Sequence, residues 1–327
     1  MMSSGPSKND ATMHTDVEDI DLEGVCLAVP LIAQEVDIPV PGGAAVLTNS
    51  SKLWENGQEI TYTFLSGTPV EHQKVSSIIT EWSLYANLTF THIPNPNPAK
   101  AVDAIIRITF VQGESWSRIG REALEPTIDK KRPTLDPRKV PTMSLGSLDP
   151  KPEITERDRG VVLHEFGHAL GLDHEHQSPA SRIIAAFKGK PNYWSEDVTR
   201  HNIINPLKTG EFSNYTEFDV TSIMMYPMVK QMSIQGIEVP LNNKLSDKDK
   251  AFMLVHYPIF DFSDRTDGWS FEIALDVLGL TGAAKEAVIE KYQSGDVAEI
   301  RAEFARHYEA VRMEKQERLA QALNPKK

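Results

Sequence analysis

The chain has little of what marks several protein classes. Its 327 residues include one cysteine, Cys26, which excludes an internal disulfide and a metal site made of thiolates alone. No apolar run reaches the length of a membrane-spanning helix, and the opening MMSSGPSKND lacks the apolar core of a secretory signal. We therefore expect a cytoplasmic protein by default, although export by a signal-independent route leaves no such mark.

Basic residues are scarce relative to acidic ones. The chain has 34 Lys and Arg against 46 Asp and Glu, a formal net charge of −12. Binding to nucleic acid or to an anionic membrane needs a basic face, so we expect neither as a partner. Part of the acidity is local, because residues 1–24 contain one Lys and six Asp or Glu.

Composition divides the chain into three parts. Residues 1–45 read as an acidic, partly disordered leader, and residues 46–260 have the patterning of a globular domain. Residues 261–327 read as a helical extension with an apolar stripe on its last helix. The stripe fits either a core face or a face that docks a protein partner. Its members are Val297, Ile300, Phe304, Tyr308 and Val311.

Strands and helices alternate within the globular part. Helical spacing covers residues 70–86, a second helix begins at Thr155 and ends at Gly171, and a third runs from Ser246 to about His256. Strand patterns occupy residues 59–64, 88–93, 104–111 and 141–148. This order predicts an α/β (α+β) fold with a mixed sheet.

Four of the ten histidines fall in the run HEFGHALGLDHEH at residues 164–176. His164 and His168 are four apart on a predicted helix, which places their Cβ atoms about 6 Å apart on one face. Glu165 is rotated about 100° from His164 around the helix, where it can reach a metal-bound water. Gly171 can reverse the chain in a left-handed conformation, so that His174 arrives as a third ligand.

Three imidazoles with one open position are the ligand set of a catalytic zinc ion, whereas a structural site is closed by a fourth protein ligand. A bare H-E-x-x-H also occurs by chance in unrelated helices. The full H-E-x-x-H-x-x-G-x-x-H, on a helix with an apolar face and a glycine stop, makes chance remote. The sequence therefore predicts one catalytic Zn²⁺ held by His164, His168 and His174.

The extended motif resembles the signature of the metzincin metallopeptidases. Metzincins also have a Met-turn beneath the metal, and the segment SIMMYP at residues 222–227 matches it. The S-I-M-x-Y form is similar to the astacin branch, over about residues 50–260. The resemblance implies a zincin fold with a twisted sheet, an active-site helix and a lower subdomain that contains the Met-turn. The chain departs from secreted astacins in lacking disulfides and a signal peptide.

The resemblance also implies roles for single residues. Met224 would pack under the histidines, and Tyr226 would be a fifth zinc ligand that moves to hydrogen-bond the tetrahedral oxyanion, a stabilisation of about 2.7–4 kcal/mol for comparable donors. The substrate would lie along an edge strand, for which the candidate is Thr142 to Leu148. Cys26 is either a latency thiolate on the zinc or a small buried residue.

These observations predict a zinc metalloendopeptidase. Zinc would activate a water molecule and polarise the scissile carbonyl, and Glu165 would be the general base. The alternative is a non-catalytic binding or regulatory protein on a metzincin scaffold that captures a partner through residues 261–327. The intact Glu165 favours the peptidase, because a binding protein has no need of that carboxylate.

Overall fold

The structure of the chain is a computed structural model. It describes residues 45–48, 50–97, 100–113, 115–126, 129, 131–174, 214–216, 219–225, 227 and 238–323. The predicted leader up to residue 44, with Cys26, lies outside the described residues, and so does Tyr226.

Within the described residues, five strands form a mixed sheet in the order β3-β2-β4-β6-β5. The first four run parallel, and β5 is antiparallel to β6. A separate antiparallel pair joins β1 (Ala45–Thr48) to β7 (Asn214–Thr216). The strands of the main sheet are β2 (Glu59–Phe64), β3 (Thr89–His92), β4 (Ile106–Thr109), β5 (Ser115–Ser117) and β6 (Met143–Leu145).

The position of β6 corrects one expectation. The segment Thr142 to Leu148 was predicted to contain an edge strand, but β6 is bonded to β4 on one side and to β5 on the other. The edge strand next to the helix that carries His164 and His168 is β5. Sequence patterning missed β5 because three residues, Ser-Trp-Ser, are too few to show alternation.

The helices begin where the sequence offers a cap. Thr68, Thr155 and Ser246 each accept a hydrogen bond from the backbone at the third helical position, and the acidic side chain there bonds back to the cap. The predicted helix over 70–86 is α1 followed by a 3₁₀ segment. The helices are α1 (Pro69–Ile78), α2 (Glu156–Ala169), α4 (Asp247–His256), α5 (Phe271–Val277), α6 (Gly282–Ser294) and α7 (Val297–Leu323), and the 3₁₀ segments are η1 (Ser50–Lys52), η2 (Ile79–Leu84), η3 (Gly120–Leu124) and η4 (Pro137–Lys139).

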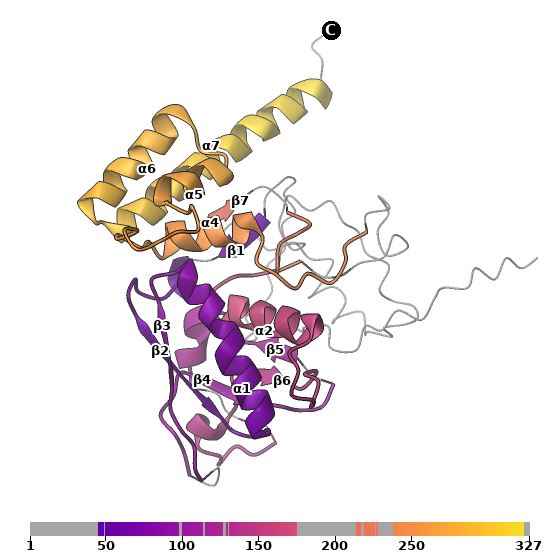
Figure 1. Cartoon of the computed structure of the whole chain (residues 1–327). Helices are drawn as coiled ribbons and strands as arrows, with labels where there is room; N and C mark the ends of the chain where they lie inside the picture. Colours follow the sequence, from indigo (N-terminus) through magenta and orange to yellow (C-terminus); the bar gives the residue numbers. More distant parts are fainter. Residues whose placement is uncertain are drawn as a thin grey trace, which may run out of the picture.

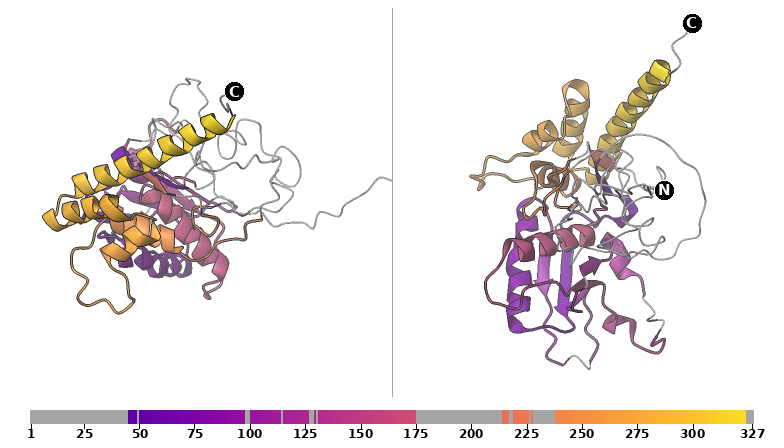
Figure 2. Two further views of the ribbon diagram at one scale, coloured as in Figure 1. Left: turned by 90° about the horizontal axis from the view of Figure 1, so that it is seen from above. Right: turned by 90° about the vertical axis from the view of Figure 1, so that its right-hand side faces the viewer.

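The main sheet with α1 and α2 forms one half of the molecule, and α4 to α7 are stacked above it (Figure 1). Both halves contribute to one cluster of buried apolar residues. Ile300, Phe304 and Tyr308, from the predicted stripe on α7, are buried in this cluster. Beyond them, the end of α7 extends away from the body (Figure 2).

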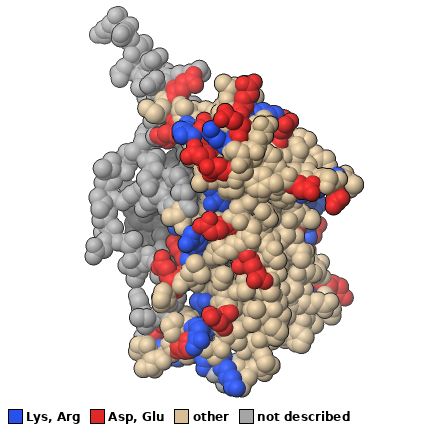
Figure 3. Space-filling view, turned by 90° about the vertical axis from the view of Figure 1, so that its left-hand side faces the viewer, with Lys and Arg blue, Asp and Glu red and all other residues tan. Residues whose placement is uncertain are grey.

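The mixed sheet and its helices confirm the predicted α/β class. None of the described helices is both long enough and apolar enough to cross a bilayer. On the face shown in Figure 3, basic and acidic side chains are interspersed among neutral ones, so this face carries no continuous basic field.

Candidate metal centre

Helix α2 carries the first two histidines of the motif and is anchored firmly at its N-terminus. Its cap is Thr155, and the third helical residue, Asp158, accepts a hydrogen bond from the Thr155 amide at 3.0 Å. Asp158 also pairs with Lys74 of α1 at 2.7 Å, and both side chains are buried. The buried ion pair holds the active-site helix against its neighbour.

The end of α2 turns the chain toward the third histidine. Gly171 has a φ of 104°, which favours glycine. Its amide donates to His168 O at 2.8 Å, and the Leu172 amide donates to Gly167 O at 3.0 Å. These two bonds form a Schellman motif, as the predicted glycine stop requires. The turn brings His174 back beside the helix.

The three predicted ligands converge. One side-chain nitrogen from each of His164, His168 and His174 lies within 4.8 Å of the others. His168 Nε2 and His174 Nε2 are 3.1 Å apart, close to the roughly 3.3 Å between two nitrogens on a tetrahedral zinc ion with Zn–N bonds of about 2.0–2.1 Å. His168 and His174 are fully buried.

Hydrogen bonds set the tautomers of the two helical histidines. His164 Nδ1 lies 2.6 Å from Ile223 O, and His168 Nδ1 lies 2.7 Å from Leu172 O. A carbonyl oxygen can only accept, so each Nδ1 carries the hydrogen and each Nε2 keeps its lone pair. Burial lowers the pKa of His164 to about 4, against a smaller opposing effect of its bond to Ile223. Neutral imidazoles with lone pairs on Nε2 fit a zinc ion.

The predicted Met-turn lies against the active-site helix. A tight turn spans Ser222 to Met225, closed by a 3.1 Å bond from the Met225 amide to Ser222 O. Met224 is fully buried, and its Sδ lies so close to Gly167 that a methyl group at Gly167 would be 2.4 Å from it. Because Gly167 has no side chain, the Met224 side chain can pack directly against α2.

A residue that sequence reasoning missed anchors this turn. Asp249 of α4 is fully buried and accepts hydrogen bonds from Ser222 Oγ at 2.7 Å and from the Ile223 amide at 2.8 Å. It also accepts from the Ser246 amide at 2.8 Å. Burial raises the pKa of Asp249 to about 6, although these hydrogen bonds lower it. The sequence predicted a helix that begins at Ser246, but it did not predict that Asp249 contacts the Met-turn.

The Ile223 peptide links Asp249 to a metal ligand. Its amide donates to Asp249, and its carbonyl accepts from His164 Nδ1. Asn242 supports the same turn by donating from Nδ2 to Ser222 O at 2.7 Å. The orientation of the first histidine is thus held by residues about 60–85 positions further along the chain.

The structure describes only one of the two predicted catalytic residues, and both roles stay predictions. Glu165 follows His164 on α2, and its side chain is 1% exposed. Tyr226 lies outside the described residues, so its role stays a prediction. Its neighbours Met225 and Pro227 are described.

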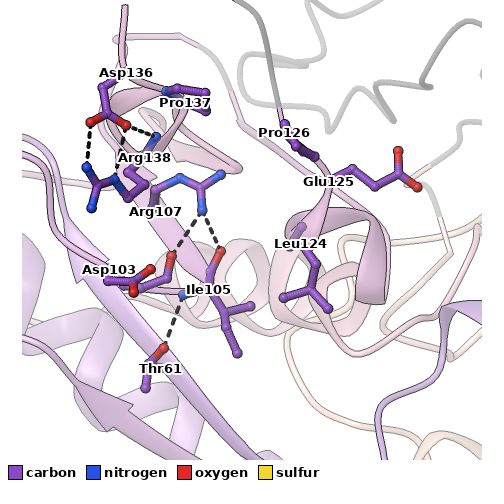
Figure 4. Close-up of a pocket in the computed structure, with 12 residues that line it drawn as sticks. Thr61, Asp103, Ile105, Arg107, Leu124, Glu125, Pro126, Asp136, Pro137 and Arg138 are labelled. Atoms are coloured by element: carbon purple, nitrogen blue, oxygen red, sulfur yellow. Dashed lines mark hydrogen bonds and ion pairs between the residues drawn. The ribbon is translucent and has the colours of Figure 1, made fainter.

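A hollow of about 550 Å³ lies between the start of β4 and the segments η3 and η4 (Figure 4). Its arginines are engaged with protein atoms. Arg107 donates from Nε to Val140 O at 2.8 Å and from Nη1 to Ala104 O at 3.0 Å, and Arg138 pairs with Asp136 at 2.8 Å. These side chains hold the backbone, and we assign the hollow no chemistry.

Solved structures resemble the chain, whereas no protein-family model and no curated protein matches it. One structure of myroilysin is 34% identical, with a TM-score of 0.56 over 66% of this chain and 99% of that one. A crystal structure of myroilysin is 31% identical, with a TM-score of 0.49 over 73% and 93%. High choriolytic enzyme 1, a hatching enzyme zinc-protease from Oryzias latipes (medaka fish), is 17% identical, with a TM-score of 0.40 over 65% and 98%.

The first comparison decides the family, because 34% identity extends over almost the whole of a known chain that also shares the fold. The convergent histidines agree with it. The chain is a member of the astacin-like zinc metallopeptidases, a zinc-dependent endopeptidase with one catalytic zinc ion and peptide or protein substrates.

Proposed function

We propose that His164, His168 and His174 hold the zinc ion through their Nε2 atoms. The observation that supports this most directly is the convergence of one ring nitrogen from each histidine, together with the bonding of both helical Nδ1 atoms to carbonyl oxygens. The zinc ion, when bound, acidifies a water molecule and polarises the scissile carbonyl.

We propose Glu165 as the general base. It takes a proton from the attacking water as the new C–O bond forms and delivers that proton to the departing amine as the C–N bond breaks. Its position beside His164 on a rigid, buried helix supports this role. Tyr226, two residues after Met224, is proposed to donate a hydrogen bond to the oxyanion.

The substrate is proposed to pair with β5. The Arg118 amide donates to Thr142 O at 2.9 Å, and Trp116 pairs with Ser144. Because bonded pairs alternate along an antiparallel ladder, the backbone groups of Ser115 and Ser117 point away from β6. An extended peptide beside α2 can add to this edge as a further strand.

The test compares two glutamates of α2. Glu165→Gln removes the base but keeps the shape, and Glu156→Gln alters an exposed residue of the first turn. We expect full-length Glu165→Gln to bind one zinc ion and to lose cleavage of an unstructured protein, while Glu156→Gln cleaves normally. Undiminished cleavage by Glu165→Gln would remove Glu165 from the mechanism.

The division into a leader (1–45), a peptidase domain (46–260) and a helical extension (261–327) stays a proposal. So does a protein partner bound through the extension, and Ile300, Phe304 and Tyr308 are buried within this chain and are not available to it. We propose no nucleic-acid or membrane partner.

A cytoplasmic location is proposed from the single cysteine, and fractionation of cells and medium would test it against signal-independent export.

A further inference from the structure

The C-terminal end of the active-site helix is held by side chains from outside the zinc motif. A helix leaves its last carbonyl groups without partners inside the helix. In α2, Ala169 O accepts from Trp54 Nε1 at 2.8 Å, and Leu170 O accepts from the Tyr257 hydroxyl at 2.7 Å. Trp54 and Tyr257 are both fully buried. These two bonds fasten the end of the helix at two consecutive carbonyls.

The fastened carbonyls lie directly before the turn that forms the metal centre. Leu170 is followed by Gly171 and then by Leu172, whose carbonyl accepts from His168 Nδ1 at 2.7 Å. His174 comes two residues later. A shift of the Leu170 carbonyl would therefore move both the acceptor that orients His168 and the segment that delivers the third ligand.

Arg301, on α7 of the C-terminal extension, holds Trp54 and Tyr257 in turn. Its Nη2 donates to Trp54 O at 3.0 Å and to His256 O at 2.6 Å, and its Nε donates to His256 O at 2.9 Å. The guanidinium lies 5.2 Å from the centre of the Tyr257 ring, within the range of a cation–π contact. His256 ends α4, so the cation also lies at the negative end of that helix.

The register of α7 keeps Arg301 in this place. Its neighbours Ile300 and Phe304 are fully buried in the main apolar cluster. The helix therefore cannot slide along its axis without exposing apolar surface. The stripe, which the sequence left open as a core face or a docking face, packs in the core and so presents Arg301 to the half of the molecule that contains α2.

We propose that the C-terminal extension is a positioning element of the metal centre, which acts through Arg301 on Tyr257 and Trp54 and so on the end of α2. The proposal rests on the proposed ligand set. It predicts that zinc affinity, and not only stability, depends on Tyr257 and Arg301.

The first test compares two buried tyrosines that each donate to a carbonyl. Tyr257→Phe removes the bond to Leu170 and also the acceptor of the Trp54 amide, which lies 3.2 Å from the hydroxyl, and Tyr308→Phe removes a bond to Leu278 within the extension. Zinc dissociation constants of the full chain are measured by competition with a chromogenic chelator. For Tyr257→Phe we expect an increase of about tenfold, the low end of the effect of groups that bond directly to metal ligands. Tyr308→Phe should bind zinc like the wild type.

The second test compares two arginines of α7. Arg301→Met keeps the apolar part of the side chain and removes the guanidinium group. Arg306→Met removes only ion pairs with Glu299 and Glu303 on the surface. We expect Arg301→Met to weaken zinc binding and to change the visible spectrum of the Co²⁺-substituted protein, and Arg306→Met to do neither.

The outcomes distinguish a failure of the positioning role from a failure of the proposed zinc ligand set. The positioning role would be overturned if both Tyr257→Phe and Arg301→Met bound zinc with the affinity of the wild type. It would also be overturned if the control variants changed the affinity by the same amount. His168→Ala serves as the reference for the ligand set. If that variant bound zinc like the wild type, the ligand assignment would be wrong, whatever the tyrosine variants showed.

Discussion

Replacing Gly167 with alanine tests the contact between the active-site helix and the Met-turn. In an exposed helix interior, glycine to alanine stabilises by about 0.8–1.0 kcal/mol. At Gly167 the new methyl group would lie 2.4 Å from Met224 Sδ and 3.4 Å from Trp82 Cζ2. Overpacking a well-packed core costs about 1–3 kcal/mol. The steric effect therefore outweighs helix propensity, and we expect Gly167→Ala to lower the free energy of unfolding by about 1 kcal/mol.

A double-mutant cycle assigns the loss to Met224. Met224→Ala alone should cost about 2–5 kcal/mol through the cavity that it leaves. In the double variant the methyl group introduced by Gly167→Ala enters that cavity, so the combined loss should fall short of the sum by about 0.5–3 kcal/mol. The assay is urea unfolding of the full-length, zinc-free protein.

Gly160→Ala is the matched control on the same helix. Its methyl group would lie 2.7 Å from the backbone oxygen of Asn242, so Met224→Ala should not rescue it. A Gly167→Ala variant that is more stable than the wild type, or strict additivity with Met224→Ala, would refute the contact as the reason for glycine in the motif.

Three further predictions concern charge and metal. Asp249 has a pKa of about 6 in the folded state and about 3.9 in the unfolded chain. Between these two values the folded protein binds a proton that the unfolded chain has released. The free energy of unfolding therefore falls by about 3 kcal/mol as the pH rises from about 4 to 6. Asp249→Asn should lack this slope in urea unfolding measured at pH 4 and pH 7, and parallel curves for the two proteins would contradict the assignment. Lys74→Met should cost about 3–5 kcal/mol because it leaves the Asp158 carboxylate buried without its cation, whereas Lys74→Met with Asp158→Asn should recover much of that loss. The zinc-free protein should have a free energy of unfolding about 2.7 kcal/mol lower than the protein in free zinc at a hundred times its dissociation constant. His168→Ala should show no such difference between the two conditions.

Local patterns in the sequence predicted the features that depend on near neighbours. The spacing of His164, His168 and Gly171 predicted a helix with two imidazoles on one face and a left-handed stop, and α2 has these features. Spacing suffices there because residues three and four apart must meet on a helix. The tight turn that Ser222 to Met225 form was expected from the resemblance of SIMMYP to a Met-turn, and not from its local pattern.

Only the tertiary structure decided which distant segments support these local features. That β5 and not β6 is the edge strand follows from pairing between segments about 30 residues apart, which strand patterning does not encode. The sequence predicted a helix that begins at Ser246, but the bond from the Ile223 amide to Asp249 needed α4 to pack beside the Met-turn.

The stripe on α7 shows the same division. The sequence by itself determined that Ile300, Phe304 and Tyr308 share a face, because helical periodicity requires it. It left open whether that face meets a partner or the chain's own core, since both bury the same apolar surface. In the folded chain this face packs in the core. The same packing brings Arg301 against Tyr257, a contact between side chains 44 residues apart that no local pattern can predict.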